Sequence, residues 1–171
     1  MQHNRKKDIS NIILGIDPGT RITGYGLIEQ INNHLTPIDF GCIRPPPTAP
    51  IEKKYFAIFT GIEALILQYQ PIALSVETQF VSKNPQSAIK LGMARGAALI
   101  AAAKYDIPVF EYTPSKAKRA VVGRGAATKS QVQHMMMQLL QLSEAPHPED
   151  AADALALAIC HAFNNKELNY V

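Results

Sequence analysis

The feature that most constrains this chain is a short apolar run that ends in an acid and a tight turn. Residues 12–17 read Ile-Ile-Leu-Gly-Ile-Asp, and branched apolar residues in a run of this length are typical of a buried strand. Pro18-Gly19 then predicts a turn, so Asp17 stands at the end of an interior strand. A lone buried carboxylate costs several kcal/mol unless it is paired or bound to a cation. The chain must therefore supply a partner for Asp17, or use it only to cap the turn.

Length and composition indicate one folded domain. The chain has 171 residues, of which 47% are hydrophobic, which suffices for a sizeable core and excludes a disordered protein. Cys42 and Cys160 have neither the spacing of a disulfide framework nor that of a metal site. There is no apolar run of bilayer length and no signal-peptide core, so we expect a cytoplasmic protein. We expect a flexible basic arm over residues 1–11, a single domain over 12–163 and a C-terminal tail over 164–171.

The order of the predicted elements indicates an α/β fold. Apolar stretches predict strands over 12–17, 24–30, 35–43, 72–77 and 109–112. Helical periodicity and capping residues predict helices over 52–69, 85–105, 114–122 and 149–163, and one that begins at a Thr128/Gln131 capping box. The first three strands have short links and should form an antiparallel meander, whereas the later strands follow helices and should pair in parallel. This predicts a five-stranded mixed sheet with helices on its faces.

Four acids lie on elements that we expect to be buried. Asp17 and Glu77 each end a strand, and Asp150 and Asp153 share one face of the last helix, which is apolar all round over residues 154–159. Asp150 alone could complement the helix macrodipole, and four unrelated surface acids are the alternative. Clustered like charges need compensation, however, and oxygen ligands suit Mg²⁺ or Mn²⁺. Two such ions about 4 Å apart can support phosphodiester hydrolysis.

Positive charge is concentrated in one part of the chain. Residues 78–143 carry a net charge of +7 and the remainder carries −4, a distribution that favours a polyanion held near a carboxylate site. The stretch between Glu111 and Glu144 contains no acid. Its cations are candidates for contacts with phosphate, although each could simply belong to a solvated basic face. They are Lys116, Lys118, Arg119, Arg124 and Lys129.

Five segments resemble the RuvC family of bacterial Holliday-junction resolvases. In order along the chain they are LGIDPGTRITGYG at 14–26, VETQF at 76–80, SAIKLGMARG at 87–96, GAATKSQV at 125–132 and DAADALALAI at 150–159. Each motif alone is weak, but together they are highly specific and span about Ile12 to His161. Two departures are Met93, where we expect a polar residue, and a basic start that is longer than usual.

The resemblance implies an RNase H-like fold and the nicking of four-way DNA junctions in recombination and DNA repair. It implies two Mg²⁺ ions in each active site, with Mn²⁺ as a substitute, and places the catalytic, metal-binding acids at Asp17, Glu77, Asp150 and Asp153. It also implies a homodimer that cuts two strands symmetrically and leaves 5′-phosphate and 3′-hydroxyl ends. The implied partners are the branch-migration proteins RuvA and RuvB.

The same resemblance sharpens the expectations for DNA contacts. Lys118 and Lys129 fall where the family has DNA-binding lysines, and Phe80 falls where it has an aromatic residue. Phe80 could stack on an unpaired base of the junction, or it could be an ordinary core residue.

Gly92 and Gly96 lie four residues apart on a predicted helix, which would let the helix of a second subunit approach closely.

Two other functions fit part of the sequence. The Asp-Pro-Gly-Thr segment at 17–20 resembles the phosphate loop of actin-like sugar kinases and ATPases, but those proteins need a second such motif, which this chain lacks. A junction-binding module without catalysis is the other alternative, and the presence of all four acids argues against it. The sequence leaves open whether His147 or His161 assists catalysis.

Overall fold

The computed structural model describes residues 11–78, 84–123 and 127–165. In these ranges the strands are β1 (Asn11–Asp17), β2 (Thr23–Ile31), β3 (His34–Ile43), β4 (Ala73–Glu77) and β5 (Val109–Tyr112). The helices are α1 (Ile51–Tyr69), α2 (Pro85–Lys104), α3 (Pro114–Val122), α4 (Lys129–Leu140) and α5 (Glu149–Asn164). No helix in these ranges is long and apolar enough to cross a membrane.

The strands form one mixed sheet in the order β3-β2-β1-β4-β5. β1, β2 and β3 pair as antiparallel neighbours, and β4 pairs in parallel with both β1 and β5. The predicted meander followed by parallel strands is therefore confirmed. Because β1, β4 and β5 run in the same direction, their carboxyl ends meet at one edge of the sheet, and Asp17 and Glu77 lie at that edge.

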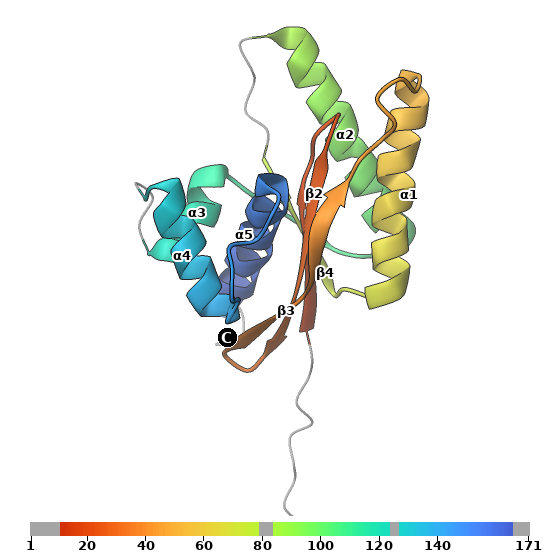
Figure 1. Ribbon diagram of the computed structural model, residues 1–171. Helices are drawn as coiled ribbons and strands as arrows, with labels where there is room; N and C mark the ends of the chain where they lie inside the picture. The colour runs from red at the N-terminus through yellow and green to blue at the C-terminus, as the bar shows by residue number, and fades with distance from the viewer. Residues whose placement is uncertain (1–10, 79–83, 124–126, 166–171) are drawn as a thin grey trace, which may run out of the picture.

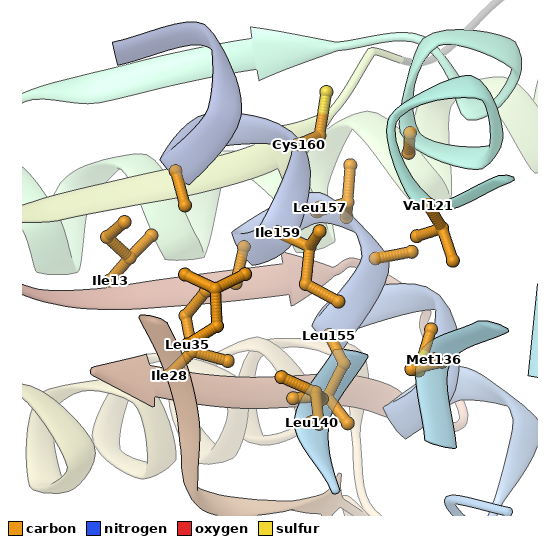
Figure 2. Close-up of a cluster of buried hydrophobic side chains, with 14 of the residues drawn as sticks. Ile13, Ile28, Leu35, Val121, Met136, Leu140, Leu155, Leu157, Ile159 and Cys160 are labelled. Atoms are coloured by element: carbon orange, nitrogen blue, oxygen red, sulfur yellow. The ribbon is translucent and has the colours of Figure 1, made fainter. Parts of the chain in front are cut away.

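Helices cover both faces of the sheet, α1 and α2 on one face and α3, α4 and α5 on the other (Figure 1). The side chains of β1 alternate between the two cores, as the period of a strand requires. Leu14 and Ile16 pack toward α1 and α2. Ile13 packs with Leu155 and Ile159 of α5 in the other core, which is shown in Figure 2. The central strand is thus buried on both faces.

Helix α5 lies unusually close to β1 and β2, because glycines face it. A Cβ atom added at Gly15 would lie 2.0 Å from the carbonyl oxygen of Ala154, and one added at Gly24 would lie 2.0 Å from that of Asp150. Any side chain at these two positions would push α5 off the sheet. Gly24 therefore fixes the depth at which the first turn of α5, with Asp150, sits against the sheet.

The differences from the predicted elements are small and lie at their ends. Ile72 was expected to begin a strand, but it is 43% exposed and β4 begins one residue later. Asn11, the last residue of the expected arm, begins β1, and Asn164, the first residue of the expected tail, still belongs to α5. The rest of the arm and most of the tail lie outside the described residues. The Asn84 N-cap and the Thr128/Gln131 capping box are both confirmed.

Candidate active site

The register of the sheet turns Asp17 and Glu77 toward α5. Leu14 and Ile16 point to the α1/α2 face, so Asp17, the next residue along β1, points to the opposite face. Ile16 pairs with Val76, whose side chain lies in the same core as that of Ile16. Glu77 therefore shares the face of Asp17. The two acids are half-buried at the carboxyl ends of neighbouring parallel strands.

The other two acids lie on the amino-terminal half of α5. Asp150 is in the first turn and is half-buried, and its backbone is held against Gly24 of β2. Asp153 is one turn further on. The helix that carries Asp153 is buried as expected, but the side chain of Asp153 itself is exposed, whereas its neighbours Ala152 and Ala154 are buried. The start of α5 lies at the open edge of the sheet, and Asp153 faces outward there.

The four acids influence one another electrostatically. Burial raises the pKa of Asp17 from 3.8 to about 8, and repulsion from Glu77, Asp153 and Asp150 contributes to that rise. Burial, and then the charge of Asp153, also raises the pKa of Glu77. Partial desolvation by the surrounding protein raises the pKa of the Asp153 carboxyl, although the side chain is largely exposed, and Lys118 and Lys129 oppose the shift. Because Asp153 is exposed, solvent screens its charge more strongly than that of Asp17.

This arrangement suits divalent cations. The four side chains offer only carboxylate oxygens, which are the ligands preferred by hard ions. Burial, and then the charges of the other three acids, raises the pKa of Asp17, and a bound cation would offset both effects. In the part of the chain that the structure describes, no three His, Cys, Asp or Glu side chains are placed so that they could hold a metal ion without rearranging. The fit to metal therefore rests on the chemistry and mutual repulsion of the donors.

Two of the predicted cations lie beside the acids. Lys118 of α3 and Lys129 of α4 line a hollow of about 120 Å³ together with Glu149 and Asp153 of α5. The positive charge of Lys118 lowers the pKa of Glu77 and of Asp153, against the effect of burial. A phosphate placed at the acids would therefore meet these two lysines on the α3/α4 side.

The other predicted DNA contacts are not gathered at this hollow. Lys116 lies over the ring of Tyr112, with its Nζ 5.0 Å from the ring centroid. Arg119 is exposed near the end of α3. Phe80 and Arg124 lie outside the described residues, so their predicted roles stay predictions.

The two histidines differ in environment. His161 is 2% exposed, its Nδ1 is 2.8 Å from the hydroxyl of Tyr112, and its ring contacts that of Phe110. Burial lowers the pKa of His161. It lies eight residues beyond Asp153, about 12 Å along the helix, and belongs to the core. His147 is exposed just before α5.

Sequence reasoning missed two contributors to the site. Glu149 forms an ion pair with Lys129 and lines the same hollow, but no local pattern pairs residues 20 positions apart on different helices. Gly24 sets the position of Asp150, and a signal for it was available. A glycine inside a predicted strand often marks a close backbone approach, and β2 has glycine at 24 and 26.

Known proteins resemble this chain over most of its length. Residues 13–161 match the family model described as "Crossover junction endodeoxyribonuclease RuvC". The RuvC of Protochlamydia amoebophila (strain UWE25) is 62% identical over 151 residues, which cover 88% of this chain and 90% of that protein. The RuvC of Vibrio cholerae is 51% identical over 159 residues, covering 92% of this chain and 90% of that protein.

Solved structures show the same relationship. Thermus thermophilus RuvC in complex with a Holliday junction substrate superposes with a TM-score of 0.87 at 33% identity, covering 92% of this chain and 96% of that one. The yeast mitochondrial Holliday junction resolvase Ydc2 superposes with a TM-score of 0.64 at 13% identity, covering 93% and 84%, and supports the fold alone. The predicted RNase H-like fold is confirmed by these neighbours. From the four acids at the sheet edge and these matches, we conclude that the chain belongs to the RuvC family of crossover junction endodeoxyribonucleases.

Proposed function

We propose that this chain cuts four-way DNA junctions with Asp17, Glu77, Asp150 and Asp153 as its catalytic, metal-binding acids. The observation that carries the proposal is the meeting of these four acids, from β1, β4 and α5, at one sheet edge. Four-way junction DNA is the substrate named for the Thermus relative. The products would be nicked strands with 5′-phosphate and 3′-hydroxyl ends.

The four carboxylates are suited to hold two Mg²⁺ ions, with Mn²⁺ as a substitute. Bound ions of this kind polarise a phosphoryl oxygen, activate a water and neutralise the leaving oxygen. The chain itself supplies the ligand charge and holds it in place. Asp17 and Glu77 are fixed by the pairing of β1 with β4, and Asp150 by the packing of α5 on Gly24. Lys118 would neutralise phosphate charge next to the acids.

We propose that the protein acts as a homodimer through one face of α2. Ile89, Met93 and Ile100 are 63%, 46% and 63% exposed, and with Gly96 they form one stripe along the helix. A Cβ at Gly92 or Gly96 would meet no other atom within 4 Å, so this stripe is open to a second helix. Met93, which departs from the polar residue we expected, extends the apolar surface.

The remaining parts of the proposal rest on the sequence signals given above. We propose that Phe80 stacks on an unpaired base at the crossover and that Lys116, Arg119 and Arg124 contact phosphates away from the cut. RuvA and RuvB are the proposed protein partners. The nuclease domain would span residues 12–163, between the basic arm and the tail.

The function is tested by a nicking assay on a synthetic four-way junction. With Mg²⁺ we expect paired cuts in two strands of like polarity, and with EDTA we expect binding without cutting. A linear duplex of the same sequences serves as the control and should stay intact. Binding without cleavage in Mg²⁺ would identify a junction-binding module instead, and ATP hydrolysis without cleavage would point to the kinase-like alternative.

The lysines of the hollow give a second prediction. Replacing Lys118 or Lys129 with Ala should weaken junction binding and reduce the slope of log K against log salt by about one for each phosphate that the protein no longer neutralises. Lys129 is paired with Glu149, but both side chains are more than half exposed, and such pairs contribute at most about 1 kcal/mol. DNA can therefore displace Glu149 at little cost. Unchanged binding across a salt titration would show that both lysines belong to a merely solvated face.

A further inference from the structure

A second basic hollow lies on the other side of the sheet edge from Lys118 and Lys129. It has a volume of about 450 Å³ and is formed where the β1–β2 loop, the start of α1 and the start of α2 meet. Its charged lining residues are Arg21, Lys54 and Lys90. No acid is among the described residues that line it. Three cations from three segments, without a countercharge in the lining, make a site for an anion.

The cations are held relative to one another by the fold. Lys54 is half-buried, and its Nζ donates to the carbonyl oxygen of Pro47 at 2.6 Å, which leaves two ammonium protons for a ligand. The next residue, Tyr55, also lines the hollow and donates its hydroxyl hydrogen to the carbonyl oxygen of Lys90 at 3.2 Å. This bond ties the start of α1 to α2, so Lys54 and Lys90 stay at the same hollow.

The loop that carries Arg21 also begins at the catalytic acid Asp17. Within that loop, the hydroxyl of Thr23 donates to the carbonyl oxygen of Gly19 at 2.8 Å, and the N–H of Gly19 points back to the same hydroxyl at 3.3 Å. These contacts fix the turn between β1 and β2. Arg21 therefore stands on an ordered turn four residues from Asp17, and a ligand in the hollow lies close to the cleavage site.

The placement of the two hollows identifies the ligand. Lys118 and Lys129 belong to α3 and α4 on one face of the sheet, whereas Lys54 and Lys90 belong to α1 and α2 on the other (Figure 1). The acids lie at the edge between these faces. A DNA strand that crosses the acids continues on both sides of the scissile phosphate, so its backbone can reach both hollows. We propose that Arg21, Lys54 and Lys90 form a second phosphate-binding site, which holds the DNA backbone on the α1/α2 side of the cut.

This inference rests on the proposed function, because it assumes that junction DNA is the ligand. It adds a contact surface that the basic stretch between Glu111 and Glu144 did not indicate, since these three cations are far apart in sequence and all precede that stretch. A duplex arm held at two places on either side of the acids would be fixed in direction as well as in position.

The test uses the full-length protein and a labelled four-way junction in EDTA, so that binding is measured without cleavage. We expect Lys54→Gln and Lys90→Gln each to reduce the slope of log K against log salt by about one. Lys53→Gln is the matched control, because it removes the same charge from the neighbouring, exposed residue of α1, which does not line the hollow. Its slope should equal that of the wild-type protein. Equal slopes in all three variants would overturn the proposal.

Phosphate-ethylation interference locates the contact on the DNA. Lys54→Gln should abolish interference at phosphates on one side of the cut, and Lys118→Gln at phosphates on the other side. An effect at the same phosphates in both variants would contradict a second site. A calorimetric titration with inorganic phosphate is a further test. If phosphate binds wild-type protein but not Lys54→Gln while the DNA slopes are unchanged, the hollow serves a free anion and the proposal is wrong.

The same titrations separate this inference from the proposed function. If the wild-type protein does not bind the junction, the proposed function fails, and the second site fails with it. If the wild-type protein binds the junction with a steep salt dependence and the hollow variants do not differ from it, only the second site is overturned. Melting temperatures of all variants should match the wild-type value, because the substituted side chains are partly or fully exposed.

Discussion

Replacing Asp17 with Asn should lower the rate of junction nicking in Mg²⁺ by about three orders of magnitude, because the loss of one ligand charge removes several kcal/mol of stabilisation from the transition state. The same substitution should raise the melting temperature of the metal-free protein. Burial, and then repulsion from Glu77 and the two acids of α5, disfavours the negative charge of Asp17, and Asn keeps the shape of the side chain without that charge. Activity and stability are thus expected to change in opposite directions.

The stability change should depend on pH in a defined way. The pKa of Asp17 is raised from 3.8 to about 8 in the folded protein. Between these two values the folded chain keeps a proton that the unfolded chain releases, so the free energy of unfolding falls as the pH rises. This contribution no longer changes above about pH 8. The melting temperature of Asp17→Asn should therefore be closest to that of the wild-type protein near pH 4. At pH 8 it should exceed the wild-type value by several degrees.

Calorimetry in EDTA at pH 4, 6 and 8, beside nicking rates in Mg²⁺, measures both effects. Asp106→Asn is the matched control, since Asp106 is exposed and its backbone φ of 54° suits Asn equally well. It should change neither quantity. An Asp17 that only caps the turn predicts the reverse pattern, a lower melting temperature with substantial cleavage remaining.

The sequence was sufficient to predict which residues end the strands but not how the helices lie on them. Local signals predict β1, the Asn84 cap and the capping box at Thr128, because each depends on residues within a few positions of one another. The strand-end acids follow from the same signals, since parallel strands bring their carboxyl ends to one edge. The positions of Asp17 and Glu77 could therefore be predicted before the fold was known.

Interactions between distant segments could not be predicted in this way. The pair formed by Lys129 and Glu149, and the hollow that gathers Arg21 and Lys54, depend on how helices cross the sheet. The exposure of Asp153 has the same origin. The helix is apolar all round only over residues 154–159, whereas its first turns project at the sheet edge, and a side chain there can face outward.

Replacing Met93 with Glu should convert the proposed dimer to monomers and abolish paired cleavage. In a two-fold symmetric interface the same stripe of α2 meets its own copy, so one substitution places two negative charges in a shared apolar interface. The cost of desolvating them should raise the dimer dissociation constant by at least about a hundredfold. Nicks should then occur singly, because each junction would carry one active site at a time.

The folded monomer should not be harmed, because Met93 is 46% exposed and the opposite side of α2, with Ala94, Ala98 and Ala102, packs in the core. Leu67→Glu is the matched control, a similarly exposed apolar residue on the neighbouring helix α1. It should leave the mass and the pairing of cuts unchanged.

Sedimentation velocity at micromolar protein gives the mass, and a cruciform plasmid distinguishes single nicks from paired cuts. A wild-type protein that is monomeric yet makes paired cuts would exclude the dimer, and a Met93→Glu protein that stays dimeric would place the interface on another surface.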